Sequence, residues 1–160
     1  MLLVAGAVVA ALAMGAEPAQ AQSDRPGLTG KPVALDATTL YFPEAQARLR
    51  LWGISGPRMR EWPWGPRARA ALDLLIFEHG RMTCEQVGGG QPPAMLCNFE
   101  GNGADPAELM LQRGWAVEAR AETERAPERL APRAEAYSAA EDAARAADAG
   151  MWGSGCKCDE

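Results

Sequence analysis

The chain has 160 residues, of which 48% are hydrophobic, and its formal net charge is −5. This length is typical of a single domain with one sizeable core. The mildly acidic balance argues against a general nucleic-acid binder, because such proteins use a basic surface to attract phosphates.

Residues 1–21 have the pattern of an export signal. Residues 1–16 are almost wholly apolar, and a polar stretch ending in the small-residue triplet 19–21 (AQA) follows. The apolar run is shorter than the roughly 20 residues that span a bilayer, which favours a cleaved signal peptide over an uncleaved anchor. We therefore expect a periplasmic or secreted protein with no membrane span after cleavage. Cysteines tend to pair in that compartment, and all four follow residue 21.

Three short strands are expected near the start of the folded part. Residues 22–31 contain glycine and proline without apolar periodicity, which predicts a leader into a domain over 32–153. From Val33 to Leu51 apolar residues alternate with others, and Pro43 and Glu44 mark a turn. This alternation predicts antiparallel strands, with arginines and leucines on opposite faces of the third.

The rest of the domain mixes helices and strands. A loop rich in proline and tryptophan (56–65) precedes a helix that is predicted to begin at Pro66 and end at Gly80. The runs 82–87 and 95–99 predict a hairpin with a wide connection. Asp105 has the pattern of a helix cap, and its short helix should end at Gly114. A last, alanine-rich helix is expected over 132–149.

This order of elements, together with three stretches of sequence, resembles the staphylococcal nuclease (thermonuclease) family. The stretches are RLWGI leading into Gly-Pro (50–57), LMLQRGWA (109–116), and an alanine-rich helix ending in Gly-Met-Trp-Gly (140–153). The resemblance covers about residues 32–153. It implies an α+β, mainly β, fold: a five-stranded OB-fold barrel with three helices.

The resemblance also implies that most of the catalytic residues have been replaced. Family members hydrolyse phosphodiesters with calcium held by aspartates, a glutamate that activates water, and two arginines that neutralise the phosphate. The aspartate positions fall on Thr38 and Ser55, the glutamate on Arg58 and the second arginine on Ala94, and only Arg50 is kept. Calcium needs charged oxygen ligands, and a general base contributes about 10²–10⁴-fold to the rate. We therefore expect no metal, no other cofactor and no hydrolysis, with Arg50 a vestige of the catalytic site.

One alternative keeps catalysis. Glu61 lies three residues after Arg58, so a shift of the loop would bring its carboxylate to the position of the general base. Arg50 and Asp36 would complete an unusual calcium-dependent site. The protein would then be an active extracytoplasmic nuclease.

Arginine and tryptophan are concentrated between residues 48 and 69, where there are six arginines and only one acidic residue. Residues 100–160 have the opposite balance, with seven basic and thirteen acidic residues. Guanidinium groups and aromatic faces are frequent contact residues. The segment predicts a groove for a protein or an anionic ligand, because arginines without balancing carboxylates are stabilised by a bound anion. Nucleic acid is a possible ligand but not the favoured one. The alternative is a solvated face with tryptophans in the core. The candidate binding residues are Arg48, Arg50, Arg58, Arg60, Trp62 and Trp64.

Two cysteine pairs are expected. Cys84 and Cys97 lie in the two strands of the predicted hairpin, where facing positions meet disulfide geometry. Cys156 and Cys158 lie in the tail 154–160, where a second disulfide is favoured over an intermolecular bond or an incomplete soft-metal site. The sequence thus predicts an exported, catalytically inactive module with a binding or structural role.

Overall fold

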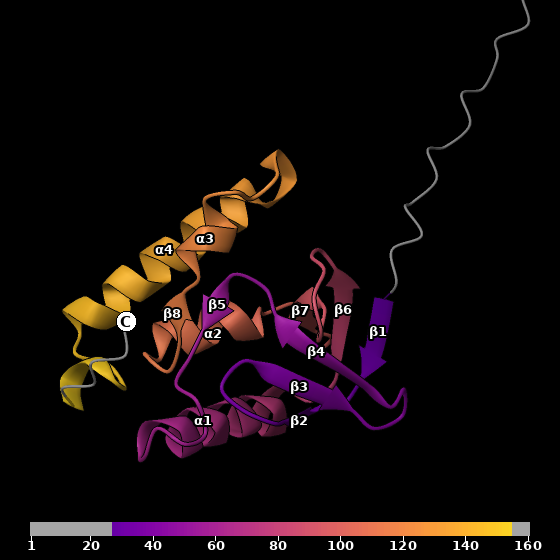
Figure 1. The fold of residues 1–160 in the computed structure, drawn as a ribbon, viewed down its shortest axis with the longest axis horizontal. Helices are drawn as coiled ribbons and strands as arrows, with labels where there is room; N and C mark the ends of the chain where they lie inside the picture. The colour runs from indigo at the N-terminus through magenta and orange to yellow at the C-terminus, as the bar shows by residue number, and fades with distance from the viewer. Residues whose placement is uncertain (1–26, 155–160) are drawn as a thin grey trace, which may run out of the picture.

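The structure is a computed structural model and describes residues 27–154 (Figure 1). The predicted signal peptide and the two cysteines of the tail lie outside the described residues. Within them the fold is α+β, with a six-stranded sheet, a smaller two-stranded sheet and several helices. No helix in this part of the chain is both long and apolar enough to cross a bilayer.

The larger sheet has the strand order β1-β6-β7-β4-β3-β2. Its neighbours are antiparallel except β4 and β7, which run parallel. Its strands are β1 (Gly27–Gly30), β2 (Val33–Ala34), β3 (Thr39–Phe42), β4 (Ala47–Leu51), β6 (Met82–Gln86) and β7 (Ala94–Phe99). The smaller sheet pairs β5 (Ile54–Ser55) with β8 (Val117–Glu118).

The helices lie around these sheets (Figure 1). They are α1 (Trp64–His79), α2 (Pro106–Gln112), α3 (Arg120–Thr123) and α4 (Ala131–Ala146), with 3₁₀ turns η1 (Glu128–Leu130) and η2 (Trp152–Ser154). The two long helices lie well apart in Figure 1, with α1 beneath β2 and β3 and α4 beyond α2 and β8. The predicted α+β class is confirmed. The predicted five-stranded barrel is not confirmed, because the larger sheet has six strands and is not closed by hydrogen bonds.

Strand β4 has the alternation that the sequence predicts. Leu49 and Leu51 are fully buried, whereas Arg48 is exposed and Arg50 is half-buried. Because successive side chains of a strand point to opposite faces, the two arginines share the outer face and the two leucines enter the core.

The leader prediction is wrong for its last residues, because 27–30 form β1. This strand pairs with β6, so that Leu28 faces Cys84. Its partner is distant in sequence, and the pairing leaves no local pattern of alternating residues. Only Lys31 and Pro32 separate β1 from β2, so the chain passes directly from one edge of the sheet to the other.

The remaining boundaries are close to those expected, with two exceptions. Helix α1 begins at Trp64, with Pro66 in its first turn, and α4 spans 131–146. The sequence did not predict α3, nor the pairing of β5 with β8. Elements of two to four residues are too short for a periodic signal.

The core lies between the larger sheet and the helices. Tyr137 of α4 is fully buried, its ring centroid lies 5.8 Å from that of Trp52, and its hydroxyl donates to Asp105 Oδ2 at 2.6 Å. The other oxygen of Asp105 accepts from the Ala107 N–H at 2.8 Å, which confirms the predicted helix cap. Cys84 and Cys97 face each other across β6 and β7 and form a disulfide with their Cα atoms 4.0 Å apart.

Candidate functional site

Strand β4 is the common neighbour of the positions that the nuclease resemblance singles out. Arg50 faces Thr39 of β3 on one side and Ala94 of β7 on the other. The Leu51 N–H donates to the carbonyl of Thr38 at 2.8 Å.

The loop after β5 reaches the same region. A Cβ atom added to Gly56 would lie 2.7 Å from the Cβ of Ala37 and 3.5 Å from the Cγ2 of Thr38. Of the positions that the resemblance assigns to the site, Thr38, Arg50 and Ala94 therefore lie together at β4, and Ser55 directly precedes Gly56, which packs against the loop of Thr38.

Arg50 is neutralised by a residue that the sequence did not point to. Its Nη2 is paired with Glu122 Oε1 from α3, and both side chains are about one-third exposed. Glu122 Oε2 also accepts from the Gly53 N–H at 3.1 Å. The expectation that Arg50 stands without a balancing carboxylate is therefore wrong. Its partner lies far along the chain, in a four-residue helix without a periodic signal.

Two further glutamates near this pair are also engaged. The nearly buried Glu118 accepts from the hydroxyl of Thr123. Glu141 is nearly buried as well, and accepts from the Glu118 N–H and from the guanidinium of Arg145. These carboxylates serve internal contacts, since buried carboxylates require such partners.

The residues around β4 do not fit a calcium ion. Thr38 and Ser55 are neutral, and Asp36 Oδ1 accepts from the N–H groups of Thr38 and Thr39 at 2.8 and 2.7 Å. Among residues 27–154 no group of three or more histidine, cysteine or acidic side chains is arranged to hold a metal. A hard cation requires several oxygen ligands, most of them charged.

Glu61, the alternative general base, is tied to its own loop. Its Oε2 accepts from the Arg58 N–H at 2.9 Å, and its carbonyl accepts from the Gly65 N–H at 2.8 Å. No hydrogen bond or ion pair joins Glu61 to Arg50 within residues 27–154. The structure thus brings Glu61 together with Arg58 rather than with the retained arginine.

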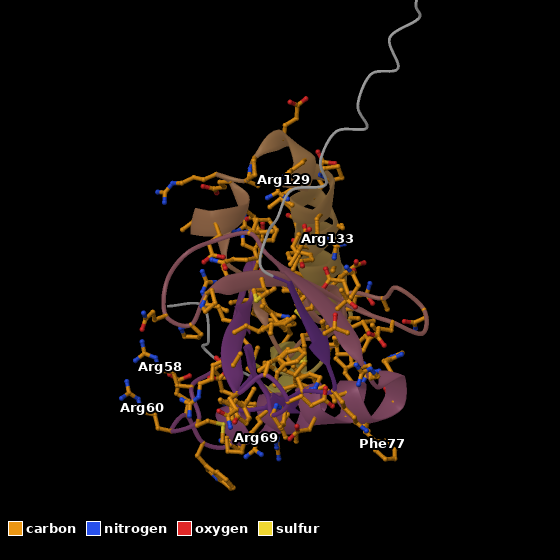
Figure 2. The ribbon with its side chains drawn as sticks, turned by 90° about the vertical axis from the view of Figure 1, so that its right-hand side faces the viewer. Arg58, Arg60, Arg69, Phe77, Arg129 and Arg133 are labelled. Atoms are coloured by element: carbon orange, nitrogen blue, oxygen red, sulfur yellow. A yellow bond between two sulfur atoms is a disulfide. The ribbon has the colours of Figure 1, made fainter. Side chains whose placement is uncertain are left out.

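The same loop presents Arg58, Arg60 and Trp62 to solvent, and we call these three residues the Arg/Trp loop. The indole of Trp62 is 80% exposed, and both arginines are exposed. Figure 2 shows Arg58 and Arg60 at the margin of the molecule, pointing away from the ribbon. Neither guanidinium has an ion-pair partner in the part of the chain that the structure describes.

Close packing fixes the Arg/Trp loop on helix α1. A Cβ added to Gly65 would lie 2.0 Å from the carbonyl oxygen of Arg58, a distance that no side chain tolerates. Pro57, at the start of the loop, is buried. The backbone of the loop is therefore held in a fixed position against helix α1, and the exposed arginines project from this fixed backbone.

The six candidate binding residues do not share one groove. Arg48 lines an open groove of about 520 Å³ beside the β6–β7 hairpin, together with Gln86 and Gln91. Arg50 is held by Glu122, and the half-buried Trp64 lies in α1 with the guanidinium of Arg67 5.7 Å from its ring centroid. Among these six residues, the three of the Arg/Trp loop lie close together in the sequence and have no side-chain ion pair or hydrogen bond within residues 27–154.

Similarity to known proteins does not add to this picture. A scan against protein-family models and a search of curated proteins each gave no match to the chain. The function is therefore inferred from the residues themselves and from their geometry.

Proposed function

We propose that this chain is an exported, staphylococcal-nuclease-like module that binds an anionic partner and does not hydrolyse phosphodiesters. The family assignment is supported by the convergence of Thr38, Ser55, Arg50 and Ala94 around β4, although these positions are scattered in the sequence. Export is supported by the disulfide and by the apolar first residues of the chain.

The OB-fold part of the proposal is supported by how the chain connects the edges of the larger sheet. β1 and β2 lie at opposite ends of the strand order but are separated by only two residues. An interrupted first strand that pairs with β6 by one half and with β3 by the other is what a small, partly open barrel requires.

Loss of hydrolysis follows from the chemistry of the site. Metal-assisted hydrolysis needs anionic ligands and a base that reaches the attacking water. Asp36 and Glu61 each bind a main-chain N–H group of their own loop, and Arg50 is held by Glu122. Of the residues that the nuclease resemblance assigns to the site, only Arg50 is a cation on β4, and its guanidinium is already paired with Glu122.

Binding through the Arg/Trp loop rests on one observation, the pair of exposed guanidinium groups without internal partners. Arg58 and Arg60 precede Glu61, whose carboxylate accepts from the Arg58 N–H, and Trp62 adds an exposed aromatic surface. Guanidinium groups bind carboxylates and phosphates in a bidentate way, and an indole adds contact area. The partner is therefore a polyanion or an acidic protein surface.

The test is a titration of the oxidised protein with inorganic polyphosphate, followed by tryptophan fluorescence at low and moderate salt. We expect saturable binding that weakens with salt, because exposed charges are screened over about 8 Å at physiological ionic strength. Arg58→Ala with Arg60→Ala should abolish it. The control, Arg125→Ala with Arg129→Ala, removes the same charge outside the Arg/Trp loop and should leave binding intact. Figure 2 shows Arg129 far from Arg58 and Arg60, and Arg129 is paired with Glu85. Equal loss in both variants would reduce the effect to net charge and refute the proposal.

A further inference from the structure

Helix α1 has a second apolar stripe that faces away from the core. Its core-facing residues are Gly65, Ala68, Leu72, Leu75 and Ile76. Arg67, Ala70, Leu74 and Phe77 follow the opposite face at spacings of three and four residues, and we call them the α1 stripe. Leu74 and Phe77 are 48% and 80% exposed, and Figure 2 shows Phe77 projecting away from the helix. A surface helix needs only one apolar face, so the stripe is surplus to folding.

The α1 stripe borders a shallow groove. This groove, of about 510 Å³, is lined by Arg67, Ala70, Ala71 and Leu74 on the helix and by Trp115 and Gly150 opposite them. The walls of the groove are mostly apolar, and the cation that lines it is Arg67, whose guanidinium lies near the ring of Trp64. The other charged residues exposed along α1 are already paired, Asp73 with Arg69 and Glu78 with Arg113.

Helix α4 carries an outward stripe of complementary character. Its buried residues are Tyr137, Ala140, Glu141 and Ala144. On the opposite face Glu135, Ala139, Asp142 and Ala146 are exposed, and we call them the α4 stripe. Neither acid forms an ion pair within residues 27–154, and the neighbouring Arg145 donates to Glu141 instead.

The two stripes are complementary in length, in charge and in the size of their side chains. At a rise of 1.5 Å per residue the α1 stripe extends about 15 Å and the α4 stripe about 17 Å. Large side chains pack closely on a helix whose facing residues are small, as Leu74 and Phe77 would on the alanines of α4. Arg67 supplies the cation that Glu135 and Asp142 lack. The helices lie apart in Figure 1, with both stripes facing away from the core, so the stripes cannot meet within one copy.

We propose that two copies of this chain associate through these surfaces, the α1 stripe of one copy packing against the α4 stripe of the next. The contact joins two different patches, which makes it a heterologous interface. The interface uses none of the residues of the Arg/Trp loop, so the proposed association can be tested independently of the proposed function.

Sedimentation velocity of the mature, oxidised protein, which begins at residue 22, over a concentration series tests this association. We expect the average mass to rise with concentration, and to rise less in about 0.5 M salt, where charges are screened within a few ångströms. Leu74→Ser with Phe77→Ser should keep the protein monomeric with unchanged circular dichroism. Val33→Ser is the control, because Val33 is an apolar residue outside both stripes whose exposure, at 43%, is close to the 48% of Leu74.

Charge reversal identifies the two faces. Arg67→Glu alone, and Glu135→Lys with Asp142→Lys, should each weaken association about tenfold or more. Mixing these two proteins should restore it, because each then presents a charge that complements the other. A wild-type protein that stays monomeric throughout, or a mixture that does not recover, overturns the inference. The inference is also overturned if the protein is monomeric and binds phosphatidylglycerol vesicles, and if Leu74→Ser with Phe77→Ser removes that vesicle binding. The α1 stripe would then be a membrane-binding surface.

Discussion

Arg50 of β4 and Glu122 of α3 form an ion pair in which the carboxylate also accepts a hydrogen bond from the Gly53 N–H. A guanidinium and a main-chain N–H together make the kind of site that binds one oxyanion. Here the oxyanion is a side chain of the same molecule. The arginine that the nuclease resemblance assigns to the phosphate thus already has its anion.

Removal of Glu122 should therefore expose an anion site. Glu122→Ala leaves Arg50 and the Gly53 N–H without their partner, and we expect pyrophosphate to raise the melting temperature of this variant more than that of the wild type. A hundredfold excess over Kd corresponds to about 2.7 kcal/mol of stabilisation. Arg50→Ala in the same background should cancel the gain. If pyrophosphate stabilises the single and double variants equally, the Arg50 site does not bind anions.

The oxidised protein should show no calcium-stimulated cleavage of DNA or RNA. Thr38, Ser55 and Arg58 stand at the positions that the nuclease resemblance assigns to the two metal ligands and the base, and none of them supplies the carboxylate oxygens that metal-assisted water activation needs. Plasmid and RNA degradation followed with calcium and with EDTA measures this directly. EDTA-sensitive cleavage that Glu61→Gln abolishes would contradict the prediction and establish the nuclease alternative.

The disulfide between Cys84 and Cys97 should contribute substantially to stability. The two cysteines are 13 positions apart in the sequence, and a loop of about this size corresponds to about 3 kcal/mol in the chain-entropy model. Denaturant unfolding of Cys84→Ser with Cys97→Ser, compared with the oxidised wild type, gives the difference. Equal denaturant midpoints for the variant and the oxidised wild type would show that the disulfide does not stabilise the protein, and would contradict the prediction. Peptide mapping under non-reducing conditions checks the pairing itself.

Tyr137 should make the fold sensitive to alkaline pH. Burial raises the pKa of its phenol above the ordinary value, and the nearby carboxylate of Asp105 raises it further. In the unfolded chain the phenol ionises near pH 10, so the stability due to the buried neutral form is present below that pH and is lost as the pH rises beyond it. Urea unfolding at pH 8 and at about pH 11 should show this loss.

Tyr137→Phe provides the control for that measurement. It removes the hydrogen bond to Asp105 Oδ2, which should cost about 1–3 kcal/mol at pH 8 because a buried acceptor loses one partner. The alkaline loss should be smaller in this variant, since the buried phenol is gone. An identical pH dependence in both proteins would show that it does not originate at Tyr137.

The sequence predicts the elements that have a periodic or capping signal, and these position most of the site. The alternation of β4 places both arginines of that strand on the outer face, and the cap at Asp105 begins α2 as expected. Glu122 could not be predicted in the same way, because α3 is a single turn and its contact with Arg50 is set by the whole fold. The strand β1 was missed for a related reason, since its pairing with β6 depends on residues far along the chain.

The short edge strands of the larger sheet have a consequence for the protein's solubility. β1 has four residues and β2 only two, and the residue before β2 is Pro32, which has no N–H to donate. Long, regular edges recruit strands from other molecules, whereas very short edges interrupted by proline do not. The sheet thus offers little template for intermolecular strand pairing, so association of this protein would proceed through side chains on its helices rather than through its backbone.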